Sequence, residues 1–172
     1  MVLIIPPGIE SDGADLLVWV PTLADPSAPT VAEVTGTSAV AFACYLTNTF
    51  DANASQDTTD DKRYCSPDVT QIAGKTTWSI GQLEYIADPQ NPESVSNKAA
   101  TAMVEGSRGY ILRRMGKDVE TAPALVAGDY VEVYSATLGP QVLMPGEAGQ
   151  LVRVKQELSG VRRIVSNYEL SA

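Results

Sequence analysis

Apolar residues recur at every second position along most of the chain, which is the pattern of strands with one buried face. In residues 130–135, for example, Val131 and Val133 alternate with other side chains. Glycine, proline, asparagine, aspartate and serine separate such segments, as expected of turns. The pattern predicts strands at residues 16–20, 31–35, 40–46, 76–86, 109–114, 130–135, 141–144, 151–158 and 161–168.

One segment follows helical spacing instead. Asn91 is a good N-cap residue, and Val95, Ala99 and Met103 follow it at intervals of four. Gly106 would end the helix. The sequence therefore predicts one α-helix of about four turns, whose thin, alanine-rich apolar stripe packs against a sheet.

The predicted strand at residues 76–86 has a break in its alternation. Trp78 and Ile80 share one face, whereas Leu83 falls out of phase with them. One inserted residue restores the phase, so we expect a β-bulge near Gly81.

The last two predicted strands are separated only by Ser159 and Gly160. A two-residue separation of this kind predicts a tight β-hairpin. In that register Glu157 would face Arg162, an opposite-charge pair that favours the hairpin.

Residues 47–75 form a polar stretch with few large apolar side chains. A connection of this length is unusual in a compact domain, where it is commonly functional, mobile or ordered by a neighbour. We expect a long assembly loop at residues 47–75 and an extended segment at residues 1–30. The candidate interface residues are six of the charged members of the loop: Asp51, Asp57, Asp60, Asp61, Lys62 and Arg63.

The 172 residues suit one domain with a core of its own. The elements above predict a single, mainly β domain over residues 1–172. We expect two packed antiparallel sheets, sandwich- or barrel-like, with one flanking α-helix and the long loop.

Charge and composition exclude several functions. The chain has 12 basic and 21 acidic residues, a net charge of −9, and no histidine. Residues 1–100 hold 13 acidic and 4 basic side chains, whereas residues 101–172 hold 8 of each. Such an acidic chain is poorly suited to binding nucleic acid through its phosphates. Without histidine there is no Ser-His-Asp or Cys-His nucleophile pair and no histidine-ligated metal.

Two partial motifs do not predict a ligand site. Residues 74–76 (GKT) lack the earlier glycine of a phosphate loop, because that position is Val69. Residues 51–57 alternate oxygen-bearing side chains as in a calcium loop, but Lys62 replaces the bidentate glutamate. We therefore expect no catalytic residues, no cofactor and no metal.

The sequence has no evident signal peptide and no run of about 20 apolar residues. These features predict a soluble protein made in the cytoplasm, with no membrane partner. In a reducing compartment Cys44 and Cys65 are expected to be idle thiols, although the sequence leaves open whether they pair.

The order of these features resembles the tail tube (major tail) proteins of long-tailed bacteriophages over about residues 70–170. The resemblance rests on the whole arrangement, since each piece is common by itself. It comprises the Trp-bearing strand at residues 75–80 (KTTWSI), the helix with residues 97–100 (NKAA), the strands at residues 109–114 (GYILRR) and 128–133 (GDYVEV), and the closing segment through Ser159 and Gly160.

The resemblance implies a virion protein with no catalytic centre. Six copies would form a ring by joining their sheets into an inner β-barrel, and rings would stack into a hollow tube through which DNA passes as transient cargo. Other tail proteins, such as the tape measure protein and the tail terminator, would be further partners. An acidic lumen suits this task, because like charge weakens adhesion of DNA.

Two other classes stay open from the sequence. One is another ring-forming virion protein, such as a head-tail connector, tail terminator or decoration protein. The other is a carbohydrate-binding β-sandwich, which would need clustered exposed aromatics; Trp19, Trp78 and the tyrosines do not cluster in one short stretch. An enzyme is the least favoured class.

Overall fold

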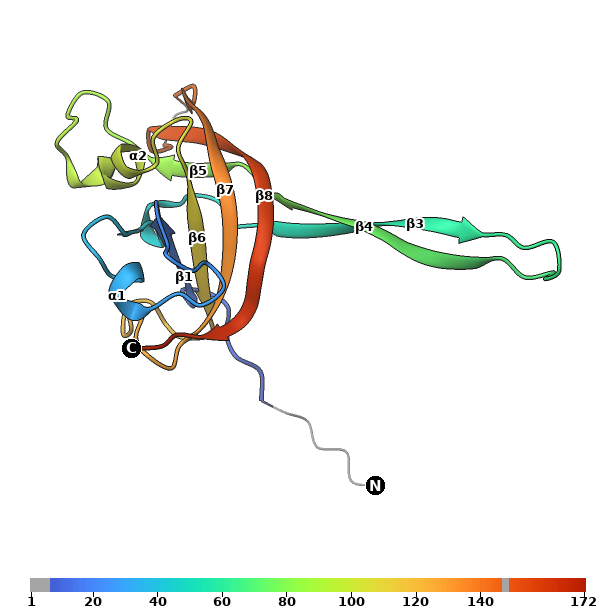
Figure 1. Ribbon diagram of the computed structural model, residues 1–172. Coiled ribbons are helices and arrows are strands. Elements are labelled where there is room, and N and C mark those ends of the chain that lie inside the picture. The colour runs from blue at the N-terminus through green and yellow to red at the C-terminus, as the bar shows by residue number, and fades with distance from the viewer. Residues whose placement is uncertain (1–6, 147–148) are drawn as a thin grey trace.

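The computed structural model describes residues 7–146 and 149–172 and is mainly β, with two antiparallel sheets (Figure 1). This confirms the predicted fold class. The larger sheet has the order β2-β1-β6-β7-β8-β5, and the smaller one is the hairpin β3-β4. The strands are β1 (Asp15–Val20), β2 (Val40–Ala41), β3 (Ala52–Asp61), β4 (Thr70–Ile80), β5 (Leu83–Ile86), β6 (Arg108–Met115), β7 (Tyr130–Leu143) and β8 (Arg153–Glu169).

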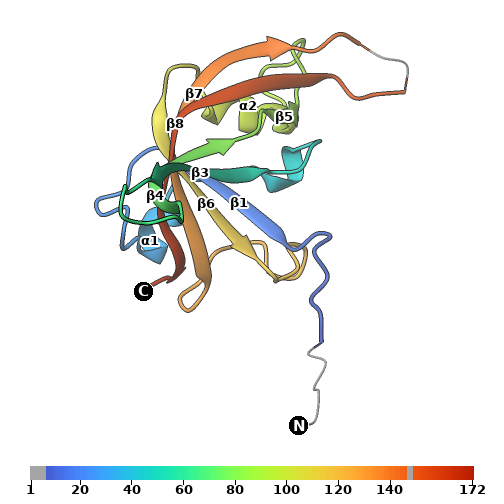
Figure 2. The same ribbon diagram turned by 90° about the vertical axis from the view of Figure 1, so that its right-hand side faces the viewer.

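The six-stranded sheet is curled (Figure 2). Its two faces carry separate apolar clusters. Leu17 and Trp19 of β1 belong to the cluster formed with the base of the β3-β4 hairpin, β5 and the short helix α2 (Lys98–Ala102). Leu16 and Val18 belong to the cluster on the opposite face, together with residues of the helix α1 (Val31–Val34) and of the chain between β6 and β7. Strand β1 is therefore buried on both faces.

Several predicted strands are confirmed, and four of them merge into two. Segments 16–20 and 109–114 are β1 and β6, whereas 130–135 and 141–144 are parts of the single strand β7. Segments 151–158 and 161–168 are likewise parts of the single strand β8.

The predicted hairpin at Ser159 and Gly160 is therefore wrong. Strand β8 continues through both residues and pairs with β7, so that Leu158 lies opposite Leu138. Gly160 has a φ of +61°, and the register of the two strands is irregular nearby. Glycine adopts this left-handed conformation without strain, so it allows an irregularity within the strand rather than a turn.

The predicted strand at residues 31–35 is also wrong, because the structure has the one-turn helix α1 (Val31–Val34) there. The Glu33 carboxylate accepts the backbone N–H of Thr30 at 3.0 Å and that of Ala24 at 2.8 Å. These two backbone bonds and the Thr30 hydroxyl hold the pKa of Glu33 below its usual value. This threonine-to-glutamate spacing is a capping box, a helix signal that strand periodicity hides.

The remaining elements are shorter than predicted. Segment 40–46 contains β2 followed by a 3-10 turn, η1 (Ala43–Tyr45). The predicted long helix is the 3-10 turn η2 (Val95–Asn97) followed by α2 (Lys98–Ala102). Asn91 does not cap it as predicted; its carbonyl instead accepts the side-chain amide of Asn97 at 2.8 Å.

The predicted break near Gly81 is present, but its consequence is different. Strand β4 ends at Ile80 in the hairpin, and β5 starts at Leu83 in the six-stranded sheet. The Gly81 N–H donates to the carbonyl of Asp51 at 2.9 Å and closes the base of the hairpin. The phase change therefore marks a switch between sheets and not a bulge in one strand.

The substitution Gly109→Ala is expected to destabilise the fold by about 1–3 kcal/mol through overpacking. A Cβ on Gly109 would lie 2.6 Å from Cζ2 of the buried Trp19 and 2.8 Å from the carbonyl oxygen of Val20. Thermal unfolding followed by circular dichroism measures the effect. Gly8→Ala is the control, since nothing lies within 4 Å of its Cβ; equal melting temperatures for the two variants would contradict the prediction.

Candidate assembly site

The β3-β4 hairpin projects from the body of the protein as a free-standing arm, defined as residues 52–80 (Figure 1). Its ten-residue strand β3 spans roughly 33 Å. Every residue from 53 to 77 except Asp61 is exposed. The long polar loop predicted at residues 47–75 is therefore mostly paired strand. Because neither face of the arm is buried, it lacks the hydrophobic alternation by which strands are recognised.

Aromatic and cationic side chains anchor the arm to the body. The Trp78 ring meets the Tyr134 ring edge-on, with centroids 6.2 Å apart, and the Arg163 guanidinium lies 4.2 Å from the Trp78 centroid. Phe50, just before the arm, also meets Tyr134 edge-on at 6.1 Å. Edge-on aromatic contacts and cation–π contacts stabilise packing beyond the burial of apolar area, and they favour one orientation of the rings. The sequence indicated a Trp-bearing strand but not these partners, which come from distant strands.

Burial raises the pKa of Tyr134 to about 12, and its hydrogen bond to Glu132 adds to the effect. The hydroxyl donates to the Glu132 carboxylate at 2.9 Å. The same carboxylate lies 3.8 Å from Arg163. At neutral pH Tyr134 therefore keeps its proton and donates it to Glu132, while the Arg163 guanidinium stacks on Trp78.

The structure brings together four of the six interface candidates named from the sequence. At the outer end of the arm, Lys62 pairs with Asp60 at 3.7 Å and Arg63 with Asp61 at 3.0 Å. The other two candidates lie elsewhere: Asp57 is at a register irregularity within β3, and Asp51 is at the base of the arm.

The outer end of the arm also exposes apolar side chains. Tyr64 is fully exposed in the tip, defined as residues 62–69, and Ile72 on β4 is 56% exposed. Cys65 is a free, exposed thiol next to Tyr64. The end of the arm is therefore an exposed, partly apolar surface, which the sequence analysis did not identify.

Strand edges are a second candidate surface. Strand β5 pairs with β8 only at residues 153–156, and within the described chain no strand pairs with that side of residues 157–169. Both outer edges of the arm are likewise unpaired among the described residues. Open edges offer backbone donors and acceptors to a strand of another chain.

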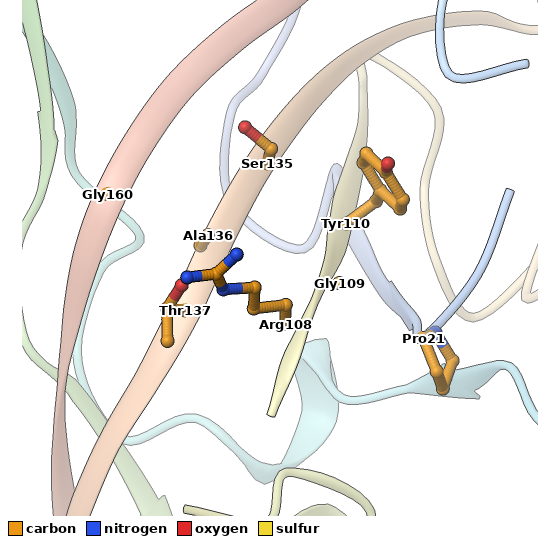
Figure 3. Close-up of a pocket in the computed structure, with 8 residues that line it drawn as sticks. All are labelled: Pro21, Arg108, Gly109, Tyr110, Ser135, Ala136, Thr137 and Gly160. Atoms are coloured by element: carbon orange, nitrogen blue, oxygen red, sulfur yellow. The ribbon is translucent and has the colours of Figure 1, made fainter. Parts of the chain in front are cut away.

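A pocket of about 420 Å³ lies where β6 and β7 run beside β8 (Figure 3). Arg108 is the charged residue of its lining, and hydroxyl groups come from Tyr110, Ser135 and Thr137. In Figure 3 the Arg108 guanidinium lies near Thr137. This lining offers hydrogen bonds to a polar group, but its hydroxyls have no carboxylate beside them among the lining residues to act as a base.

A buried ion pair organises the chain between β6 and β7. Arg114 and Asp129 side chains are 2% and 0% exposed and approach to 3.3 Å. Arg114 also donates to the carbonyls of Ala122 at 2.6 Å and Ala124 at 3.0 Å, and Lys117 donates to Asp129. Arg114 is therefore a buried cation whose counter-charge lies inside the body of the protein.

Within the described ranges, Cys44 and Cys65 are both free, and no cluster of potential metal-binding side chains is found. Residues 51–57, tested above as a calcium loop, lie mostly on β3. No helix in the part of the chain that the structure describes is long and apolar enough to cross a membrane.

The projecting arm and the open strand edges of this mainly β body are surfaces to which other chains can bind. The family model of the phage tail tube protein matches residues 3–172. The chain therefore belongs to the phage tail tube protein family, as its resemblance predicted. It is a structural protein of the phage tail and a component of the virion.

Comparison with solved structures finds a similar chain in the cryo-EM structure of the anti-feeding prophage (AFP) baseplate, 6-fold symmetrised. The two share 8% sequence identity over 94% of this chain and 97% of the other, with a TM-score of 0.47. No curated protein matches the chain.

Proposed function

We propose that the protein forms hexameric rings that stack into the hollow tail tube through which DNA passes. The observation that carries this proposal is the arm. An isolated two-stranded hairpin is marginally stable in water, and the exposed part of this one has no cover from its own body. A neighbouring subunit would supply that cover and explain why the arm is held by a dedicated aromatic anchor at its base.

The open edge of β8 supports the same function. Residues 157–169 leave one row of backbone groups unpaired among the described residues. Pairing with a strand of the next subunit satisfies these groups, and a closed ring leaves no edge exposed. A curled sheet with one open side is suited to extension into such a barrel.

The charge of the chain supports a passage for DNA rather than a binding site. The net charge is −9, and residues 1–100 carry all of the excess. A surface of this sign repels phosphate and lets the duplex slide. We propose that part of this acidic excess lines or rims the channel, and that the tape measure protein and the tail terminator are further partners.

Negative-stain electron microscopy of the purified protein tests the proposal. We expect rings of six subunits with a central hole and, at higher protein concentration, tubes of stacked rings. A protein that stays monomeric at every concentration would contradict the proposal. Rings that never stack would instead indicate a connector or terminator.

A further inference from the structure

We propose that the tip of the arm docks into an apolar pocket on the body of a second copy of the chain, with Tyr64 as the inserted side chain. This inference rests on the proposed assembly and names the surface that receives the arm. It is argued from the tip, the pocket, their placement in the fold and their charges.

The tip has the composition of an inserted segment. Tyr64 is fully exposed, and Val69 is 53% exposed. Tyrosine combines a large apolar ring with a polar hydroxyl and loses little side-chain entropy on binding, so it is favoured at the centre of interfaces. Exposing these side chains to water at the end of an anchored arm does not stabilise the monomer.

The receiving pocket lies at the β2-β1 end of the sheet and has a volume of about 430 Å³. Its walls come from Leu16 and Ala41 on the strands, Tyr45 in η1, and Val119 and Pro123 in the chain between β6 and β7. Mostly apolar walls of this kind suit an aromatic ring.

The pocket and the arm lie on different sides of the molecule. The pocket is bounded by β1 and β2, whereas the arm contacts the sheet at β8, four strands away from β2 in the sheet order. Figure 1 shows the arm leaving the body on the β8 side, away from β1. A contact between two different surfaces is head-to-tail, and repeating it produces rings or stacked arrays rather than isolated dimers.

The tip, residues 62–69, carries two cations and one acid, Asp68, and therefore a small positive excess. Lys62 and Arg63 precede Tyr64, and although each pairs with an aspartate, both side chains remain 70% exposed. The pocket carries one charged lining residue, Glu120, which is exposed at its rim. Docking Tyr64 therefore brings free donors of the tip toward an unshielded carboxylate.

The two native cysteines allow this contact to be tested by chemical cross-linking. Cys65 follows Tyr64 in the tip, and Cys44 is an exposed lining residue of the pocket. They are the only cysteines in the chain. Treating assembled protein with a short bis-maleimide should link Cys65 of one subunit to Cys44 of the next. Because each subunit contributes one tip and one pocket, denaturing gels should show a ladder beyond the dimer.

Single variants separate this linkage from others. Cys44→Ser and Cys65→Ser should each collapse the ladder to monomer, whereas a dimer that persists in either variant would reveal a like-with-like contact and overturn the proposal. Tyr64→Ala should lose the ladder and Tyr64→Phe should keep it. Val95→Ser, which alters an exposed apolar residue outside both surfaces, is the matched control and should keep it as well.

The outcomes also separate this inference from the proposed function. Tubes that form without a ladder would overturn the docking site while leaving the tube function intact. Failure to assemble, with no ladder at high protein concentration, would overturn both.

Discussion

Replacing residues 55–77 by an Asn-Gly turn is expected to leave a folded monomer that forms no tubes. Ala54 and Trp78, which remain on either side of the replaced segment, are paired across the hairpin, so a two-residue turn can join the shortened strands in register. The anchor stays intact, because Trp78 and Phe50 lie outside the replaced segment. The variant therefore removes the exposed part of the arm without opening the core.

Circular dichroism, size-exclusion chromatography and negative-stain microscopy measure the result. The melting temperature should stay close to that of wild-type monomer, while the fraction of protein in tubes should fall below detection. Thr59→Ser with Thr76→Ser is the matched control, since it alters two exposed positions of the arm but keeps its length. Normal tubes from the shortened chain would refute an assembly role for the arm.

The hydrophobic pattern was sufficient to predict the strands that have a buried face. Val131 and Val133 are buried, whereas Tyr130 and Glu132 beside them are not, so this alternation is visible in the sequence. The same pattern could not show that β8 continues through Gly160. Whether a glycine forms a turn or a strand irregularity depends on whether a long partner strand lies alongside, and here β7 supplies one.

The arm shows a different limit of sequence reasoning. The charged residues Asp60, Asp61, Lys62 and Arg63 pointed to this segment as a candidate interface, but they did not indicate its shape. Strand signals arise from burial, and this hairpin is exposed on both faces in the isolated subunit. Hydrogen bonds between the backbones of its two strands and the anchor at its base hold the hairpin in shape. Neither leaves a periodic pattern in the sequence.

The buried ion pair was missed for a related reason. Strand period two places Arg113 and Arg114 on opposite faces, which the structure confirms: Arg113 pairs with Asp15 at 2.6 Å, and Arg114 is buried on the other side. The burial depends on the chain segment that folds back over Arg114 and presents Asp129. Nothing in the local pattern indicates that this segment closes over a charge.

Asp129→Ala is expected to destabilise the protein by about 3–5 kcal/mol, the usual cost of leaving one partner of a buried ion pair uncompensated. Asp129 is fully buried and accepts hydrogen bonds from Arg114, Lys117 and the N–H of Val126. Its loss leaves the Arg114 guanidinium without a counter-charge. Urea unfolding of monomer measures the change in the free energy of unfolding, and Asp129→Asn, which keeps an acceptor oxygen, should lose less.

The effect should also depend on pH in a defined direction. Burial alone would raise the pKa of Asp129, but the hydrogen bonds from Lys117, Val126 and Arg114 outweigh it and lower the pKa below 3.8. A carboxyl whose pKa is lower in the folded state stabilises the fold above its unfolded pKa, near 3.9. That contribution is lost as the pH falls through the folded pKa, so the difference between wild type and Asp129→Ala should shrink below about pH 4.

Asp118→Ala is the matched control, since it removes from the same segment an exposed carboxylate whose side chain accepts the N–H of Glu120 at 2.9 Å. It should change stability by about 1 kcal/mol, as expected for the loss of one exposed hydrogen bond. Because Arg114 holds the segment that carries Val119 and Pro123, Asp129→Ala should also deform the proposed pocket and weaken cross-linking between Cys44 and Cys65. Equal stability of the Asp118 and Asp129 variants at pH 7 would show that the ion pair does not hold this segment in place.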